Sequence, residues 1–208
     1  ETMITNNYAD HIYTLSKGIS WITFQNECAA IRIDDQLCKQ GKGITLYSSF
    51  KQNLKGDKIY TVFEDSEGDE WILTNKGISI IGKKQVDSDF PFQYIKEADG
   101  IIYLVSQSDK LASYNFKTRQ FKFIEIPYHV SMINEVKKFD SNTLLLATDN
   151  GLIIYKIKEK EFQLIDIRTS TQPSNVVQSV YQDHYKELWI FPQTTGVIRY
   201  NPSTKEMQ

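Results

Sequence analysis

Five carboxylates crowd one short segment of the chain: Glu64, Asp65, Glu67, Asp69 and Glu70. Such a group could supply the paired acids of glycoside hydrolysis or the oxygen ligands of a calcium loop. Hydrolysis needs two carboxylates held across a cleft, whereas neighbours on one turn project side by side. A calcium loop needs ligands at alternating positions and a closing bidentate Glu, and residues 65–69 lack that order. The favoured interpretation is a solvated β-turn, because Asp, Ser and Gly form turns for local reasons.

The remaining chemistry-bearing residues are scattered. His11, His129 and His184 have no partner two or four positions away, so we predict ordinary surface histidines and no metal site. The sequence contains no Gly-x-Ser-x-Gly elbow, phosphate loop or dinucleotide fingerprint. We therefore expect no catalytic residue and no cofactor in this chain.

Two cysteines, Cys28 and Cys38, bracket a predicted strand at residues 29–33 and a polar turn at 34–36. Neighbouring strands could bring the two sulfurs together as a disulfide in an oxidising compartment. Two unpaired thiols, one of them buried, are the alternative. Zinc is not expected, because the sequence has no Cys-x-x-Cys pair.

The elements that would position these residues follow a repeat. In two places an apolar run leads through a polar turn ending in Gly to a Trp that begins the next apolar run, first at Gly18 and Trp21 and again at Gly68 and Trp71. The anchor residues of the repeat are Trp21, Trp71, Tyr103, Leu145 and Trp189. Their spacing of about forty residues is typical of four-stranded propeller blades.

Local patterns agree with an all-β fold. Short β-branched or aromatic runs predict strands at 59–63, 71–73, 101–105, 121–126, 143–147 and 152–155. In the second repeat we expect an inner strand at 59–63, a hairpin turn at 64–69, a second strand at 71–74 and a third at 78–81. The Trp of each second strand would be a wedge between adjacent sheets. We predict a single β-propeller domain over residues 1–208, with about five four-stranded antiparallel blades, as part of a larger propeller.

Charge and hydropathy exclude two classes of partner. The net charge is −2 and the pI is near 6.0, which gives no reason to expect nucleic acid. No apolar run approaches the ~20 residues that cross a bilayer, so we expect no direct membrane contact. The chain opens with Glu1-Thr2-Met3 and shows no signal peptide, which suggests a processed product or a piece of something longer.

Two segments resemble the two-component regulator propeller repeat, residues 63–78 and 181–201. Its pattern is an acidic pair, a Gly turn, Leu-Trp-Ile-Gly-Thr, then Gly-Leu and a Tyr. This chain departs from the pattern where Tyr103 and Leu145 replace Trp, and where the Gly after Trp-Ile is Leu73, Val105, Ala147 or Phe191. Such repeats are typical of the extracytoplasmic sensor region of hybrid two-component regulators in gut Bacteroidetes, which respond to glycans.

The resemblance implies a non-catalytic, periplasmic sensor module of a hybrid histidine kinase whose catalytic parts lie outside this chain. Its implied partners are an oligosaccharide, neighbouring blades or domains of the parent chain, and a second copy of the parent in a homodimer. A protein-interaction scaffold of the WD-repeat type is the alternative. A propeller lyase or glycosidase is less favoured, because paired acids and metal ligands are missing.

Propeller geometry predicts where a ligand would bind. Loops from an outer strand to the next inner strand share a face with loops between second and third strands, and binding residues concentrate on such loops. The candidates on this face are Tyr128, His129, Gln172, Gln193 and Asn75. An aromatic ring beside hydrogen-bonding side chains suits the hydroxyl groups of a sugar.

Overall fold

The structure is a computed structural model that describes residues 8–24, 29–48, 54–56, 58–82, 88–98, 100–115, 118, 120–194 and 196–208. In these residues antiparallel β-sheet dominates, joined by a 3-10 turn at Ser16–Gly18 and a short helix, α1 (Asp35–Cys38). The chain divides into two compact units, residues 1–95 and 96–208.

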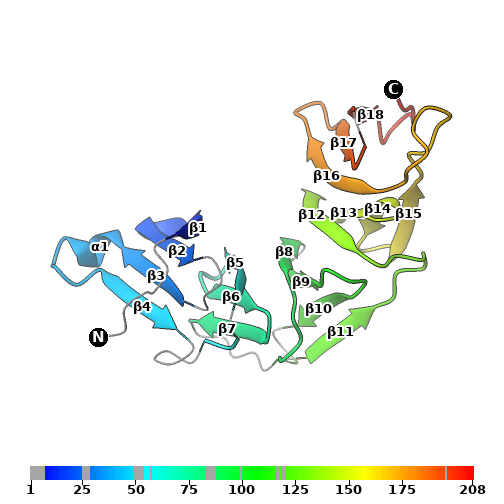
Figure 1. The fold of residues 1–208 in the computed structure, drawn as a ribbon. Helices are drawn as coiled ribbons and strands as arrows, with labels where there is room; N and C mark the ends of the chain where they lie inside the picture. Colours follow the sequence, from blue (N-terminus) through cyan, green and yellow to red (C-terminus); the bar gives the residue numbers. More distant parts are fainter. Residues whose placement is uncertain are drawn as a thin grey trace. The chain divides into compact units, whose positions relative to one another are not determined.

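The first unit holds two sheets, labelled by strand in Figure 1. Sheet A consists of β1 (Ala9–Thr14), β2 (Ile19–Phe24), β3 (Ala29–Asp34) and β4 (Ile44–Ser48). Sheet B consists of β5 (Ile59–Glu64), β6 (Glu70–Thr74) and β7 (Gly77–Ile81). Beyond β7, the Ile78 N–H donates to the Ser88 carbonyl at 3.1 Å, so backbone pairing continues at this edge.

The second unit holds three sheets, apart from the first two residues of β8. Sheet C consists of β8 (Tyr94–Ala98), β9 (Ile101–Val105), β10 (Leu111–Asn115) and β11 (Gln120–Ile124). Sheet D consists of β12 (Ile133–Asp140), β13 (Thr143–Thr148), β14 (Gly151–Lys156) and β15 (Glu161–Ile165). Sheet E consists of β16 (Val177–Gln182), β17 (Leu188–Pro192) and β18 (Ile198–Tyr200), and Met207 pairs with Tyr200 at its edge.

Every sheet is a meander in which each strand pairs with the next one in sequence. This is the connectivity of a propeller blade, and it confirms the predicted all-β fold with about five blades. Two details differ from the prediction. Sheets B and E have three strands in the part of the chain that the structure describes. The expected polar turn at 34–36 is the start of α1, because the Asp34 carboxylate accepts from the Gln36 and Leu37 N–H groups, both at 3.1 Å, and caps the helix.

The sheets repeat one another in register. In four inner strands the pairing shifts after the first paired residue, a β-bulge that bends the strand at the same place; these shifts lie at Ala9/His11, Ile59/Thr61, Ile133/Glu135 and Val177/Ser179. Downstream of the bulge, each anchor pairs with the equivalent position of its inner strand. Tyr13 pairs with Trp21, Phe63 with Trp71, Lys137 with Leu145 and Tyr181 with Trp189. Positions in different sheets can therefore be compared one by one.

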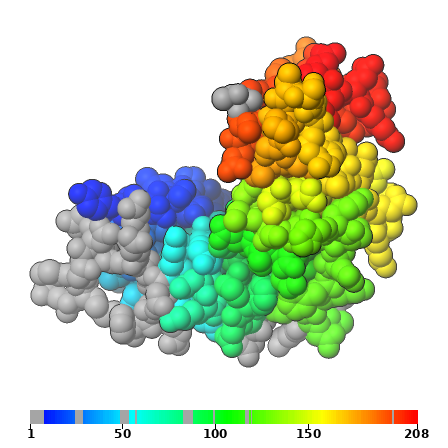
Figure 2. Space-filling view, turned by 45° about the vertical axis from the view of Figure 1, so that its right-hand side comes forward, coloured from blue at the N-terminus to red at the C-terminus, as the bar shows by residue number. Residues whose placement is uncertain are grey.

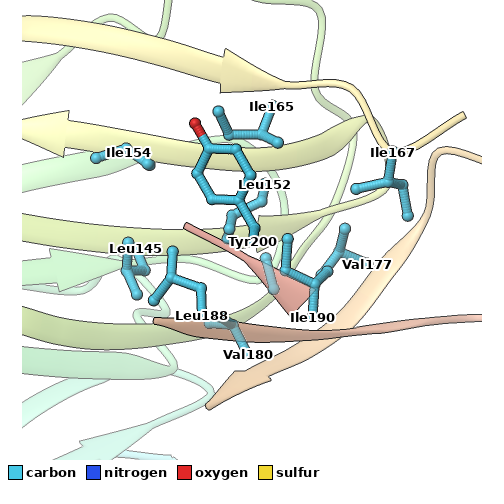
Figure 3. Packing of buried hydrophobic residues seen from close by; sticks show 11 residues of the cluster. Leu145, Leu152, Ile154, Ile165, Ile167, Val177, Val180, Leu188, Ile190 and Tyr200 are labelled. Carbon is cyan, nitrogen blue, oxygen red and sulfur yellow. The ribbon is translucent and has the colours of Figure 1, made fainter. Parts of the chain in front are cut away.

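Neighbouring sheets within a unit share a hydrophobic core. In the first unit, Trp21 and Ile19 of sheet A pack with Val62 and Ile72 of sheet B. In the second unit, the side chains of sheets D and E interdigitate, as Figure 3 shows for Leu145 and Leu152 opposite Leu188 and Ile190. The space-filling view shows the orange and red residues of sheet E packed onto the yellow residues of sheet D (Figure 2). These cores stabilise the sheets by removing apolar surface from water.

The five anchors all lie on second strands, but their burial differs. Trp21 and Trp71 are 0% exposed, Tyr103 is 3% and Leu145 is 1%, whereas Trp189 is 36% exposed. The prediction of a buried wedge is therefore wrong for Trp189. Along β17, Leu188 and Ile190 face sheet D and are buried, and Trp189 and Phe191 alternate onto the opposite face.

Candidate functional site

The acidic segment that could have carried chemistry is part of the scaffold. It forms the hairpin turn between β5 and β6, as predicted, but it is not fully solvated, because Asp65, Asp69 and Glu70 are buried. Asp65 Oδ1 accepts from the N–H groups of Glu67 and Asp69 at 2.9 and 3.0 Å, and Oδ2 accepts from Trp71 Nε1 at 2.8 Å. This carboxylate holds both the turn and the anchor indole.

Glu70 serves the contact between sheets A and B. Its carboxylate accepts from Trp21 Nε1 at 2.5 Å and forms a bidentate pair with Arg32, through Nη2 at 2.7 Å and Nε at 3.0 Å. The hydrogen bonds to Glu70 raise the pKa of Arg32. Two side chains of sheet A thus converge on one carboxylate of sheet B, so Glu70 has a structural role in holding the two sheets together.

The turn before Trp189 repeats the turn before Trp71 atom for atom. Asp183 Oδ1 accepts from the N–H groups of Tyr185 and Glu187 at 2.9 and 3.0 Å, and Oδ2 accepts from Trp189 Nε1 at 3.0 Å. The hydrogen bond from Trp189 lowers the pKa of Asp183 from its usual range, helped by the two backbone donors. This spacing, Asp six residues before Trp, is a sequence signal for the clamp.

A continuous polar network joins the loops at one end of sheets D and E. Asn150 donates to the His129 carbonyl at 2.9 Å and accepts from Asn175 Nδ2 at 3.0 Å. Asn175 Oδ1 in turn accepts from the Ile167 N–H at 2.9 Å. The loop after β11, the β13–β14 turn and the β15–β16 loop therefore form one surface, as propeller geometry predicts.

This surface contains three of the five candidate ligand residues, and a fourth, Gln193, lies beside it in the β17–β18 connection. His129 is exposed, and Tyr128 is half-buried with its hydroxyl donating to the Phe162 carbonyl at 3.0 Å. Gln172 Nε2 donates to the Ser174 carbonyl at 3.1 Å, and its Oε1 accepts from Thr194. Gln193 is exposed, and its N–H donates to the Val176 carbonyl at 2.9 Å.

The structure thus assigns different roles to the four candidates. Tyr128 and Gln172 are engaged in holding loops, whereas the side chains of His129 and Gln193 face solvent. The fifth candidate, Asn75, lies in the first unit at the corresponding turn of sheet B. Its Oδ1 accepts from the Lys58 N–H at 3.1 Å.

A charged cluster on inner strands was not foreseen from the sequence. Lys137 Nζ lies 2.9 Å from Glu135 Oε1, and Glu135 Oε2 accepts from the Val180 N–H at 3.1 Å. Burial lowers the pKa of Lys96, and the charge of Lys137 acts in the same direction. The sequence signal for this cluster is the polar run in β12. A simple alternation of inward and outward side chains does not predict it, because the β-bulge shifts the register of this strand.

The other predicted chemistry can be placed only in part. Among the described residues, no three His, Cys, Asp or Glu side chains gather as metal ligands. Cys38 is exposed at the end of α1, and Cys28 lies outside the described residues, so the predicted disulfide stays untested. The described part of the chain also contains no helix with the length and apolar character of a membrane span.

Comparison with known proteins identifies a distant relative of this chain. No protein-family model matches the chain. The chain is similar to "Histidine kinase P4" of Formosa agariphila, with 22% identity over 221 residues. That alignment covers 100% of this chain and 14% of the relative, so the chain spans about one seventh of the protein it matches.

Solved structures share the fold at low identity. The extracellular domain of the hybrid two-component system BT3049 from B. thetaiotaomicron matches with a TM-score of 0.70 and 14% identity, over 98% of this chain and 28% of that one. Virginiamycin B lyase from Staphylococcus aureus matches with a TM-score of 0.71 and 18% identity, over 95% of this chain and 67% of that one. These matches confirm the predicted fold, and one of them is the extracellular domain of a hybrid two-component system, the class that the repeat resembles.

Proposed function

We propose that this chain is a run of blades from the extracytoplasmic sensor region of a hybrid two-component histidine kinase, and that it is itself non-catalytic. The observation that carries the proposal is the match of 98% of the chain to a domain of that class. The use of Asp65, Glu70 and Asp183 as structural clamps supports it. In this proposal the chain lies in the periplasm, and the parent acts as a homodimer.

The proposed ligand is an oligosaccharide bound on the loop surface of sheets D and E. The exposed imidazole of His129 and amide of Gln193 can donate to and accept from sugar hydroxyls. Both side chains project from loops whose backbones are held by hydrogen bonds, so ordering them on binding costs little entropy. Binding would be read out by differential affinity for two states of the parent.

Isothermal titration calorimetry of the 208-residue chain against a panel of neutral and acidic oligosaccharides tests this proposal. We expect saturable binding of one sugar class, weakened about tenfold by Gln193→Ala or His129→Ala, as for one lost hydrogen bond of ~1.4 kcal/mol. Gln120→Ala, an exposed residue at the start of β11, is the control and should bind like the parent sequence. Absence of saturable binding, or equal weakening by the control, contradicts the loop surface as the site.

A lyase is the second candidate, favoured by the TM-score of 0.71 to virginiamycin B lyase. One structure of that enzyme is described as a catalytically inactive His-to-Ala form with quinupristin. Two histidines of this chain can be compared with that role. His11 lies 3.3 Å from Asp10, and the ring of His184 lies against the ring of Tyr185. Incubation with quinupristin, followed by mass spectrometry, separates the candidates: unchanged quinupristin supports the sensor, and enzymatic conversion supports the lyase.

A further inference from the structure

The first strands of sheets C, D and E bring charged residues together along one edge of the second unit. Figure 1 shows β8, β12 and β16 following one another along this edge. Lys137 Nζ lies 2.9 Å from Glu135 Oε1, and the Val180 N–H donates to Glu135 Oε2 at 3.1 Å. Both oxygens of this carboxylate are therefore engaged, one by β12 itself and the other by β16. We call Lys96, Glu135 and Lys137 the basic cluster.

Lys96 is placed to reach β12 by a pattern that the first strands share. The burial pattern of β8 matches that of the start of β12, so Lys96 corresponds to Asn134, and each follows a buried isoleucine. Asn134 Nδ2 donates to the Val177 carbonyl of β16, the next first strand, at 2.8 Å. In the same way Lys96 of β8 lies close enough to β12 for its charge to interact with those of Glu135 and Lys137.

Positive charge exceeds negative charge by one in the basic cluster. Among the residues that the structure describes, the Lys96 ammonium has no hydrogen bond and no carboxylate within ion-pair distance. Burial lowers the pKa of Lys96, and Lys137 acts in the same direction while Glu135 opposes it. An ammonium that is partly withdrawn from water is stabilised by a counterion. The cluster therefore lacks one negative charge.

The donors of the basic cluster can be reached by a small ligand. Lys96 is half-buried, and the Lys137 side chain is 49% exposed. Each ammonium carries three donors, and Lys137 directs one of them to Glu135. Two ammonium groups from neighbouring strands suit the two oxygens of one carboxylate. The charge of Glu135 repels ligands of higher negative charge, such as a phosphate dianion.

We infer that the basic cluster is an anion site, which binds a singly charged carboxylate between the ammonium groups of Lys96 and Lys137. We assign the carboxylate of a sugar acid as its ligand, and this assignment alone rests on the proposed function. The site differs from the loop surface, because its residues lie within β8 and β12 and not on the connections between strands. The bound carboxylate supplies the charge that the cluster lacks.

An NMR titration of the 208-residue chain, with lysine isotopically labelled at Cε, tests this inference. The probe is galacturonate, and the methyl ester of the same sugar is the uncharged control. We expect galacturonate to shift the Lys96 signal saturably and to raise the pKa of Lys96, because a nearby anion favours the charged amine. The methyl ester should do neither.

Substitutions distinguish this site from a general effect of positive charge. Lys96→Met keeps an unbranched side chain without its charge, and it should weaken galacturonate binding at least about tenfold, as for loss of a charge-assisted hydrogen bond. Lys138→Met, at an exposed position of β12, is the matched control and should bind galacturonate like the parent sequence. Glu135→Gln should strengthen binding, because it removes a charge that repels the anion. A merely structural role of Glu135 predicts no such gain.

Four results overturn the inference. They are a Lys96 signal that does not respond to galacturonate, an equal response to the methyl ester, equal weakening by Lys138→Met and Lys96→Met, and weaker binding by Glu135→Gln. Circular dichroism verifies that each variant is folded.

Acetate, as a third probe, separates this inference from the proposed function. Saturable binding of acetate as tight as that of galacturonate supports the anion site and contradicts the assignment of a sugar acid. Tighter binding of galacturonate than of acetate supports both.

Discussion

Trp71 Nε1 donates to Asp65 Oδ2 at 2.8 Å, and Trp189 Nε1 donates to Asp183 Oδ2 at 3.0 Å. The same clamp, with the same two backbone bonds to each Oδ1, thus occurs in a buried and in an exposed setting. Asp65 is 5% exposed and Trp71 is 0% exposed, whereas Trp189 is 36% exposed. Comparing the two clamps therefore shows how burial changes the contribution of one hydrogen-bond arrangement to stability.

We expect Asp65→Ala to lower the free energy of unfolding by about 2–4 kcal/mol, because it removes the acceptor of two buried donors, the Trp71 indole N–H and the Asp69 N–H. Asp183→Ala should have a much smaller effect, since water can satisfy the donors that it frees. Urea denaturation followed by circular dichroism measures both. Equal losses in the two variants would show that burial does not decide the strength of the clamp.

Acid should weaken the turn at Asp183. Its pKa is lowered in the folded chain, first by the hydrogen bond from Trp189. A carboxyl group with a lowered folded pKa stabilises the fold above its unfolded pKa, near 3.9, and this stabilisation is lost as pH falls through the folded value. Carbon-detected NMR titration should give Asp183 a pKa below 3.9, and Asp183→Asn should remove this part of the acid sensitivity. A pKa at or above 3.9 contradicts the hydrogen-bond geometry.

Glu70→Ala should cost about 3–5 kcal/mol of unfolding free energy, because it leaves Arg32 as a poorly solvated charge without its bidentate partner. Arg32 is 18% and Glu70 is 8% exposed at the side chain. Asp89→Ala is the control: its pair with Lys55 has an 86% exposed carboxylate and should contribute no more than about 1 kcal/mol. If the double variant Arg32→Leu/Glu70→Leu is as unstable as Glu70→Ala, the unpaired charge is not the cause.

The turn at Gly77 should reject a side chain more strongly than the turn at Gly100. Gly77 has φ +131° and a Cβ atom added there would lie 2.1 Å from the Ser88 carbonyl oxygen, whereas Gly100 has φ +69° and no atom within 4 Å of that position. We expect Gly77→Ala to cost more than about 3 kcal/mol through strain and overlap, and Gly100→Ala about 1–2 kcal/mol. Thermal unfolding of both variants measures the difference, and similar midpoints would contradict the close approach of Ser88.

Local features of the fold were predictable because their causes are local. Alternating apolar residues and polar turns place strands such as β9 and β13 to within a residue or so. The helix α1 was missed because an Asp followed by polar residues is equally suited to a turn and to a helix cap, and the choice depends on the backbone that follows.

The candidate site was predictable only as a set of loops. Propeller connectivity brings the loop of His129, the turn of Asn150 and the loop of Asn175 together. Which side chains remain available could not be foreseen, because the Tyr128 hydroxyl is engaged by Phe162 and the Gln172 amide oxygen by Thr194, which lie on other strands or loops.

The sequence by itself determined the strands and most of the turns, since each depends on residues within about ten positions of one another, and the similarity of these segments along the chain indicated the repeat. The Asp-to-Trp clamp was recognised only in the structure. The tertiary structure alone decided which members of a repeated pattern are buried. Trp71 and Trp189 have the same local context, yet one is covered and the other is 36% exposed. Burial depends on what packs against a sheet from elsewhere in the chain, and no local pattern of residues encodes that.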